Sequence, residues 1–146
     1  MRPHWTRAVA AGVVATSVTT FVIVVAASLG APVLEAGSLL TLFLAADTPV
    51  GWTFHFLTGI AVAVVYAALF STHLPGSPAV RGITFGALLW SVAQGMWFLQ
   101  PQSAPLGEVV RLAIWSLPAH LTYGSLVGWL CGVHSRRLPT SIRAHA

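Results

Sequence analysis

Three stretches of apolar and small residues, at about 9–29, 50–72 and 80–99, are each long enough to cross a lipid bilayer. A helical residue rises about 1.5 Å and the hydrocarbon core is about 30 Å thick, so roughly twenty residues suffice. A fourth stretch ends near residue 133 and begins at either Gly107 or Pro118. Because backbone groups inside a bilayer must bond to one another, these stretches predict four transmembrane helices.

The composition also indicates a membrane protein. The chain has 56% hydrophobic and 7% charged residues, whereas a soluble domain has about a quarter charged residues. This excludes a disordered tail, a coiled coil and a soluble enzyme with a polar cleft. The net charge of +4 does not predict a nucleic-acid partner, because the arginines flank apolar stretches and form no polar face. We therefore expect one integral membrane domain over 1–146, with the lipid bilayer as its partner.

The distribution of charge predicts the orientation. Six of the seven basic residues precede the first or third stretch or follow the fourth: Arg2, Arg7, Arg81, Arg136, Arg137 and Arg143. The three acids, Glu35, Asp47 and Glu108, fall on the opposite side, together with Arg111. Cytoplasmic loops of membrane proteins are enriched in arginine and lysine. Both termini, including a tail at 135–146, are therefore predicted to be cytoplasmic.

The sequence contains a predicted internal duplication. When Arg7 is aligned with Arg81, the first and third stretches share the pattern R-x4-G-x4-S-V. When His55 is aligned with His120, the second and fourth share H-x3-G-x3 followed by a small residue. The repeats extend over about 7–72 and 81–134. Repeats of two spans have the same orientation, so we expect them to be related by an axis along the membrane normal.

Each predicted repeat also has a short segment between its two spans. One lies at about 34–46 and the other at 107–117, and the duplication favours a separate short helix on the outer face for both. A helix of about thirteen residues is too short to cross the bilayer. The predicted fold is thus an all-α membrane protein, a four-transmembrane-helix bundle of two duplicated helical hairpins with short outer-face helical segments.

The candidate site residues are His55 and His120. Each shares a helix face with a glycine four residues later, Gly59 or Gly124, and His55 also shares its face with Tyr66. A histidine above a glycine leaves a notch that admits either a neighbouring helix backbone or a flat ligand.

Three roles are open for these histidines. In the first, each hydrogen-bonds a neighbouring hydroxyl or carbonyl and holds the bundle together. In the second, both imidazoles ligate a haem b, with Gly59 and Gly124 admitting the porphyrin and Tyr66 nearby. In the third, His55, His120, Glu35 and Glu108 bind a divalent metal at the outer surface.

Three further polar residues in the spans need partners there. Gln94 lies in the middle of the third stretch, Tyr66 lies in the second and Tyr123 lies in the fourth. A polar group inside a bilayer needs a hydrogen-bond partner, and the nearest is a neighbouring helix. We predict that all three residues donate hydrogen bonds between helices.

The ordered motifs resemble those of an uncharacterised family of small prokaryotic four-helix integral membrane proteins, a domain of unknown function. The motifs are Trp52-x2-His55-Phe56-x2-Gly59, Tyr66-Ala67, Arg81-Gly82-x2-Phe85-Gly86-x3-Trp90 and His120-x2-Tyr123-Gly124-x3-Gly128. The resemblance covers nearly the whole chain and implies a bacterial or archaeal plasma membrane. It implies no activity.

Two functions follow from these observations. The first is a non-enzymatic membrane component or accessory subunit, whose small-residue faces fit either a homo-oligomer or a larger membrane complex. The alternative is a haem- or metal-binding subunit in electron transfer, with His55 and His120 as ligands. Coupled transport is less well supported, because the spans lack acids and a clearly broken helix.

Overall fold

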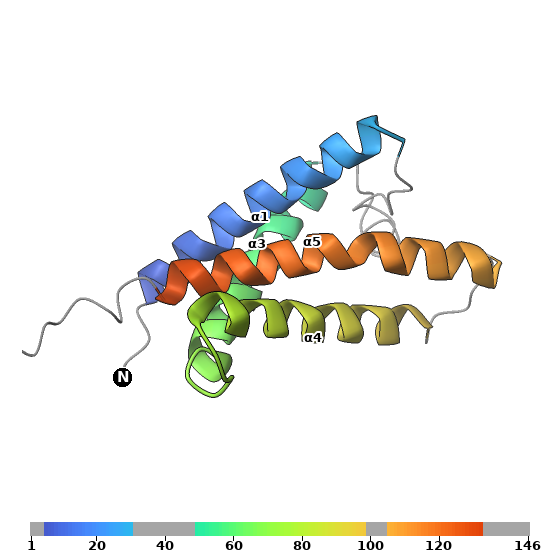
Figure 1. Cartoon of the computed structure of the whole chain (residues 1–146). Helices are drawn as coiled ribbons and strands as arrows, with labels where there is room; N and C mark the ends of the chain where they lie inside the picture. The colour runs from blue at the N-terminus through green and yellow to red at the C-terminus, as the bar shows by residue number, and fades with distance from the viewer. Residues whose placement is uncertain (1–4, 31–48, 99–104, 133–146) are drawn as a thin grey trace, which may run out of the picture.

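The computed structural model describes residues 5–30, 49–98 and 105–132. Within these ranges the chain is helical and contains no strand, which confirms the predicted helical class (Figure 1). The helices are α1 (Trp5–Ser28), α3 (Pro49–Val65) with the short π-helix η1 (Tyr66–Phe70) that continues it, α4 (Pro78–Phe98) and α5 (Leu106–Gly132). Their bounds lie close to the four apolar stretches.

Two helical segments, Trp5–Ser28 and Gly51–Phe70, are long and apolar enough to cross a membrane. The predicted membrane nature is supported to that extent, and the crossing of the bilayer by all four helices stays a prediction.

Local chemistry sets the helix ends. Gly30 follows α1 with a φ of 84°, a conformation that glycine adopts without a steric penalty, and its N–H donates to Ala27 O at 2.9 Å. At the start of α4, the Ser77 hydroxyl accepts a hydrogen bond from Val80 N at 3.4 Å. Pro78 occupies the first helical position, where its missing N–H costs nothing.

The π-helix η1 is a single widened turn at the end of α3. Ser71 N donates to Tyr66 O at 2.9 Å, which is the five-residue spacing of a π-helix. After it, a turn containing Gly76 with a φ of 98° leads into α4. Tyr66, the first residue of η1, is 1% exposed.

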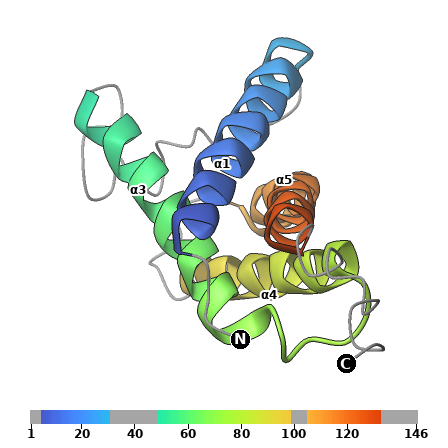
Figure 2. The same ribbon diagram turned by 90° about the vertical axis from the view of Figure 1, so that its left-hand side faces the viewer.

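The helices form two neighbouring pairs. α1 packs against α3, α4 packs against α5, and α1 also packs against α5, which joins the pairs (Figure 2). The core lies where they meet and consists of Ala15, Ala63, Tyr66, Phe85 and Val127. The ring of Phe85 lies 5.1 Å from that of Tyr66 and 5.0 Å from that of Phe70, between ring centres.

One predicted element is wrong. Residues 107–117 do not form a separate short helix, because α5 runs without interruption from Leu106 to Gly132 with Pro118 inside it. A proline removes one helical hydrogen bond, here the bond to the carbonyl of Ile114. Side-chain bonds hold this stretch against α4, because Trp90 Nε1 donates to Ala113 O at 2.9 Å. The other predicted short segment, 34–46, lies outside the described residues.

Candidate functional site

Glycines bring the backbones of α4 and α5 into direct contact. Gly82 and Gly86 of α4 face Gly124 and Gly128 of α5. A Cβ atom added at Gly124 would lie 2.7 Å from Gly86 Cα, and one added at Gly128 would lie 2.6 Å from Gly82 Cα. Side-chain atoms do not fit at these distances, so only glycine allows this approach.

A second close contact joins α1 and α3. A Cβ atom at Gly12 would lie 2.7 Å from Ile60 Cα and 3.2 Å from Gly59 O. Gly59 in turn lies directly against the side chain of Thr16. Neighbouring helices therefore occupy the spaces beside Gly59 and Gly124, which is one of the two occupants expected from the sequence.

The two helix pairs use aligned glycines in different registers. Gly124 lies against both Gly82 and Gly86, whereas Gly59 lies against Gly12 and Thr16. In the predicted alignment Gly12 corresponds to Gly86. Relative to this alignment, the position of α3 along α1 is shifted by one helical turn from the position of α5 along α4.

Two differences between the aligned helices explain this offset. α1 has Ala8 at the position aligned with Gly82, where a Cβ atom would strike the carbonyl of Gly124. α4 has Trp90 at the position aligned with Thr16, and an indole is too large to lie against a helix backbone as Thr16 does. Each pair therefore excludes the register of the other.

His55 links α3 to α1. Its Nε2 atom forms a 3.0 Å hydrogen bond with the Thr20 hydroxyl, and its half-buried ring lies edge-on to the rings of Trp52 and Phe56. Sequence reasoning did not find Thr20, because a threonine on an apolar helix is common and its partner lies on a different helix.

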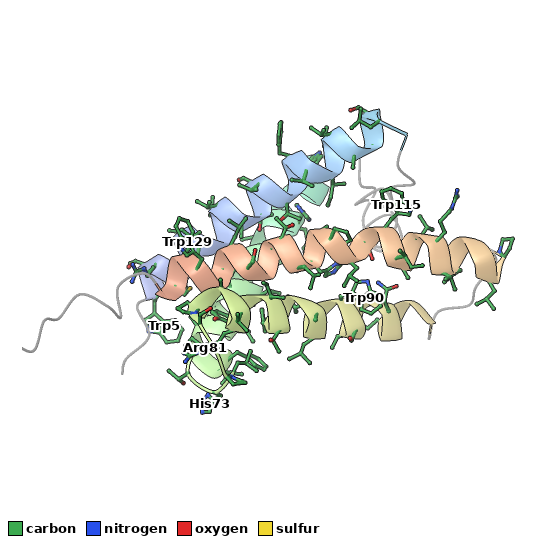
Figure 3. All side chains as sticks on the ribbon, viewed as in Figure 1. Trp5, His73, Arg81, Trp90, Trp115 and Trp129 are labelled. Atoms are coloured by element: carbon green, nitrogen blue, oxygen red, sulfur yellow. The ribbon has the colours of Figure 1, made fainter. Side chains whose placement is uncertain are left out.

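His120 belongs to a polar group between α4 and α5. Its Nδ1–H donates to Ser116 O at 2.9 Å, within its own helix. The Ser116 hydroxyl accepts hydrogen bonds from Gln94 Nε2 at 3.3 Å and from Trp90 Nε1 at 3.2 Å (Figure 3). The bond from Gln94 confirms the predicted interhelix donor.

The two histidines bond to different partners. The Tyr123 hydroxyl donates to Gly59 O, which joins α5 to α3 and confirms the predicted interhelix role of Tyr123. His55 precedes Gly59, and His120 precedes Tyr123, by about one helical turn each. In the part of the chain that the structure describes, no hydrogen bond or ring contact joins the two imidazoles.

The remaining predicted site residues lie elsewhere. Tyr66 is eleven residues beyond His55, about 16 Å along the helix axis, and packs in the core against Phe85. Glu35 lies outside the described residues, and Glu108 lies in the first turn of α5. Among the residues of 5–30, 49–98 and 105–132 whose side chains are described, no three histidine, cysteine or acidic side chains gather as a metal site would require.

The arginine ends of the helices contain a second cluster, around Tyr66. Cys131 packs against the core that includes Tyr66. Arg81 Nη1 donates to Ser71 O at 2.7 Å, at the end of η1, while Arg81 Nε is buried without a hydrogen-bond partner.

Comparison with known proteins identifies the family. Residues 3–141 match the model of a family of unknown function, DUF6789. The chain belongs to DUF6789. The expected membership of an uncharacterised family is thereby confirmed. Neither the curated proteins nor the solved structures contain a match to this DUF6789 chain.

The sequence contained signals for some of the residues that it did not single out. In this DUF6789 protein, Gly82 and Gly86 are spaced four residues apart, as are Gly124 and Gly128, which is the small-xxx-small pattern of close helix packing. Ser116 had no such signal, because its importance depends on the α4 side chains that meet it.

Proposed function

We propose that this DUF6789 protein is a non-enzymatic component of a membrane, in which α1, α3 with η1, α4 and α5 all cross the bilayer. The observation that carries the proposal is the distribution of apolar side chains. Large ones cover the outside of the helices, and glycines form the closest contacts between them.

The exposed side chains of α1 illustrate this distribution. Phe21 is 69% exposed and Val24 is 56% exposed, whereas the inward Ala8, Ala11 and Ala15 are at most 1% exposed. A soluble protein rarely exposes contiguous apolar patches larger than a few hundred Å², because each Å² left in water costs about 25 cal/mol. In a bilayer these side chains contact lipid tails at no such cost.

The apolar segments do not fit the core of a soluble protein. Such a core helix is mostly buried, but only 28% of the apolar window of α1 and 11% of that of α3 with η1 is buried. α4 and α5 have exposed apolar residues of the same kind, among them Leu88, Val92, Val110 and Ile114. Because glycines bring α4 and α5 into direct contact, the two helices pack as one unit. This supports the insertion of both helices into the bilayer.

The proposed orientation has both termini in the cytoplasm. Arg7 lies near the start of α1 and Arg81 near the start of α4, and these helix starts lie at the same end of the structure (Figure 1). Trp5 and Trp129, at the same end, are 53% and 56% exposed. Exposed indoles favour the headgroup region, so this end fits a membrane surface, and its arginines favour the cytoplasmic one.

One observation supports the proposed duplication of repeats 7–72 and 81–134. The aligned glycines mediate the helix contact in both pairs.

Between the two functions expected from the sequence, the contacts favour the non-enzymatic one. A porphyrin edge beside His55 or His120 needs free space at Gly59 or Gly124, and Thr16 and the α4 backbone occupy that space. A metal centre needs further ligands beside the two imidazoles.

The test uses protein purified from membranes. We expect the chain to resist extraction by alkaline carbonate and, when purified in detergent, to show no Soret band and no stoichiometric metal. A Soret band that is lost in both His55→Ala and His120→Ala would replace this proposal with the haem-binding one. Release of the chain by carbonate would refute membrane insertion.

A further inference from the structure

Arg81 carries a charge that the described structure does not balance. Its guanidinium has five N–H groups, and among the described residues one bond is formed, from Nη1 to the neutral carbonyl of Ser71. The Nε atom is buried without a partner, so water cannot compensate for the missing bond. The residue as a whole is half-buried, and Nη2 is not among its buried atoms without a partner.

The described ranges contain no carboxylate that could balance this charge. Their one acid is Glu108, at the other end of α5. Gly82, next to Arg81, packs against Gly128, which is twenty residues after Glu108 and about 30 Å further along the helix.

Arg81 also lies at the end of the structure that carries exposed indoles. Figure 3 shows Trp5, Trp129 and Arg81 at the same end of the structure. Both indoles are more than half exposed, and such indoles lie at the headgroup level. The planar guanidinium matches the oxygen atoms of a phosphate group and binds them by charge-assisted hydrogen bonds.

We propose that Arg81 binds the phosphate group of an anionic phospholipid in the cytoplasmic leaflet, through the open edge of its guanidinium. This inference rests on the proposed membrane insertion. The same chemistry would fit free phosphate, and the position of Arg81 beside exposed indoles favours the lipid headgroup.

The test compares variants of the full chain in vesicles of phosphatidylcholine alone and of phosphatidylcholine with phosphatidylglycerol. Native mass spectrometry measures the phosphatidylglycerol that stays bound. One arginine near a charged membrane surface corresponds to about a fivefold change in affinity. We expect Arg81→Gln to lower the preference for phosphatidylglycerol by about fivefold. Arg111→Gln, with its exposed side chain near the other end of α5, is the matched control for the loss of one arginine, and it should lower the preference less than Arg81→Gln does.

Arg81→Lys tests whether Arg81→Gln acts by destabilising the fold, because lysine keeps the positive charge near the end of η1. We expect it to retain more of the lipid preference than Arg81→Gln, with the same helical circular dichroism. Equal lipid preference in the wild type and a folded Arg81→Gln would overturn the proposal. If inorganic phosphate displaces phosphatidylglycerol at equal concentration, the site binds free phosphate and the proposal of a lipid headgroup is wrong.

Vesicle flotation separates this proposal from the one that it rests on. If the wild-type protein does not float with phosphatidylcholine vesicles, membrane insertion fails. If it floats equally with both vesicle types and shows no preference between the lipids, insertion stands and the phosphate site fails.

Discussion

Replacement of Gly124 by alanine should separate α4 from α5. The new Cβ atom would lie 2.7 Å from both the Cα and the N atom of Gly86, and it would also strike the carbonyl of Gly82. An ordinary contact needs at least 3.4 Å, so the helices must move roughly 0.7 Å or more apart. The obstructing atoms belong to the backbone and cannot rotate away. Overpacking of this kind costs about 1–3 kcal/mol.

Gly95 is the matched control, because it lies on the exposed side of α4 with nothing within 4 Å of an added Cβ atom. Alanine there should be neutral or stabilising by up to about 1 kcal/mol, since it is the better helix former. Thermal unfolding in detergent, followed by circular dichroism, measures both variants. If Gly124→Ala is no less stable than Gly95→Ala, the backbone contact between α4 and α5 is not as described.

Three further predictions concern individual contacts. Thr20→Val should lower the free energy of unfolding by about 0.6–1.7 kcal/mol, because it removes the hydrogen bond to His55. In a His55→Phe background this loss should disappear, and full additivity of the two changes would contradict the hydrogen bond. Tyr123→Phe should cost a similar amount, about 1 kcal/mol, through the lost bond to Gly59 O, and an unchanged unfolding temperature would argue against that bond. Phe85→Ala should cost about 3–5 kcal/mol, because its buried ring packs in the core; a loss below 1 kcal/mol in the same unfolding assay would be inconsistent with that packing.

The helices could be predicted because long apolar stretches indicate helices from local sequence alone. The length of each apolar stretch set the bounds of α1, α3 and α4 to within a few residues of those observed. The start of α5 could not be found in this way. Pro118 and the comparison between repeats favoured a break, whereas the bonds from Trp90 and Ser116 to Ala113 O come from side chains whose positions depend on packing with α4.

The candidate site was predicted less completely, for a related reason. Periodicity placed His55 above Gly59 and His120 above Gly124, but it could not show what fills each notch. That depends on the register between neighbouring helices. The register differs between the pairs because of Thr16 and Trp90, and neither residue indicates the register when it is considered alone.

Cysteine accessibility tests the four-span bundle most directly. In a Cys131→Ser background, single cysteines would replace Leu29 after α1, Ser77 before α4 and Leu106 at the start of α5, all exposed positions. A membrane-impermeant maleimide should label the Leu29 and Leu106 positions in intact cells, and the Ser77 position only after permeabilisation. Labelling of all three positions from the same side would contradict the crossing of the membrane by these helices.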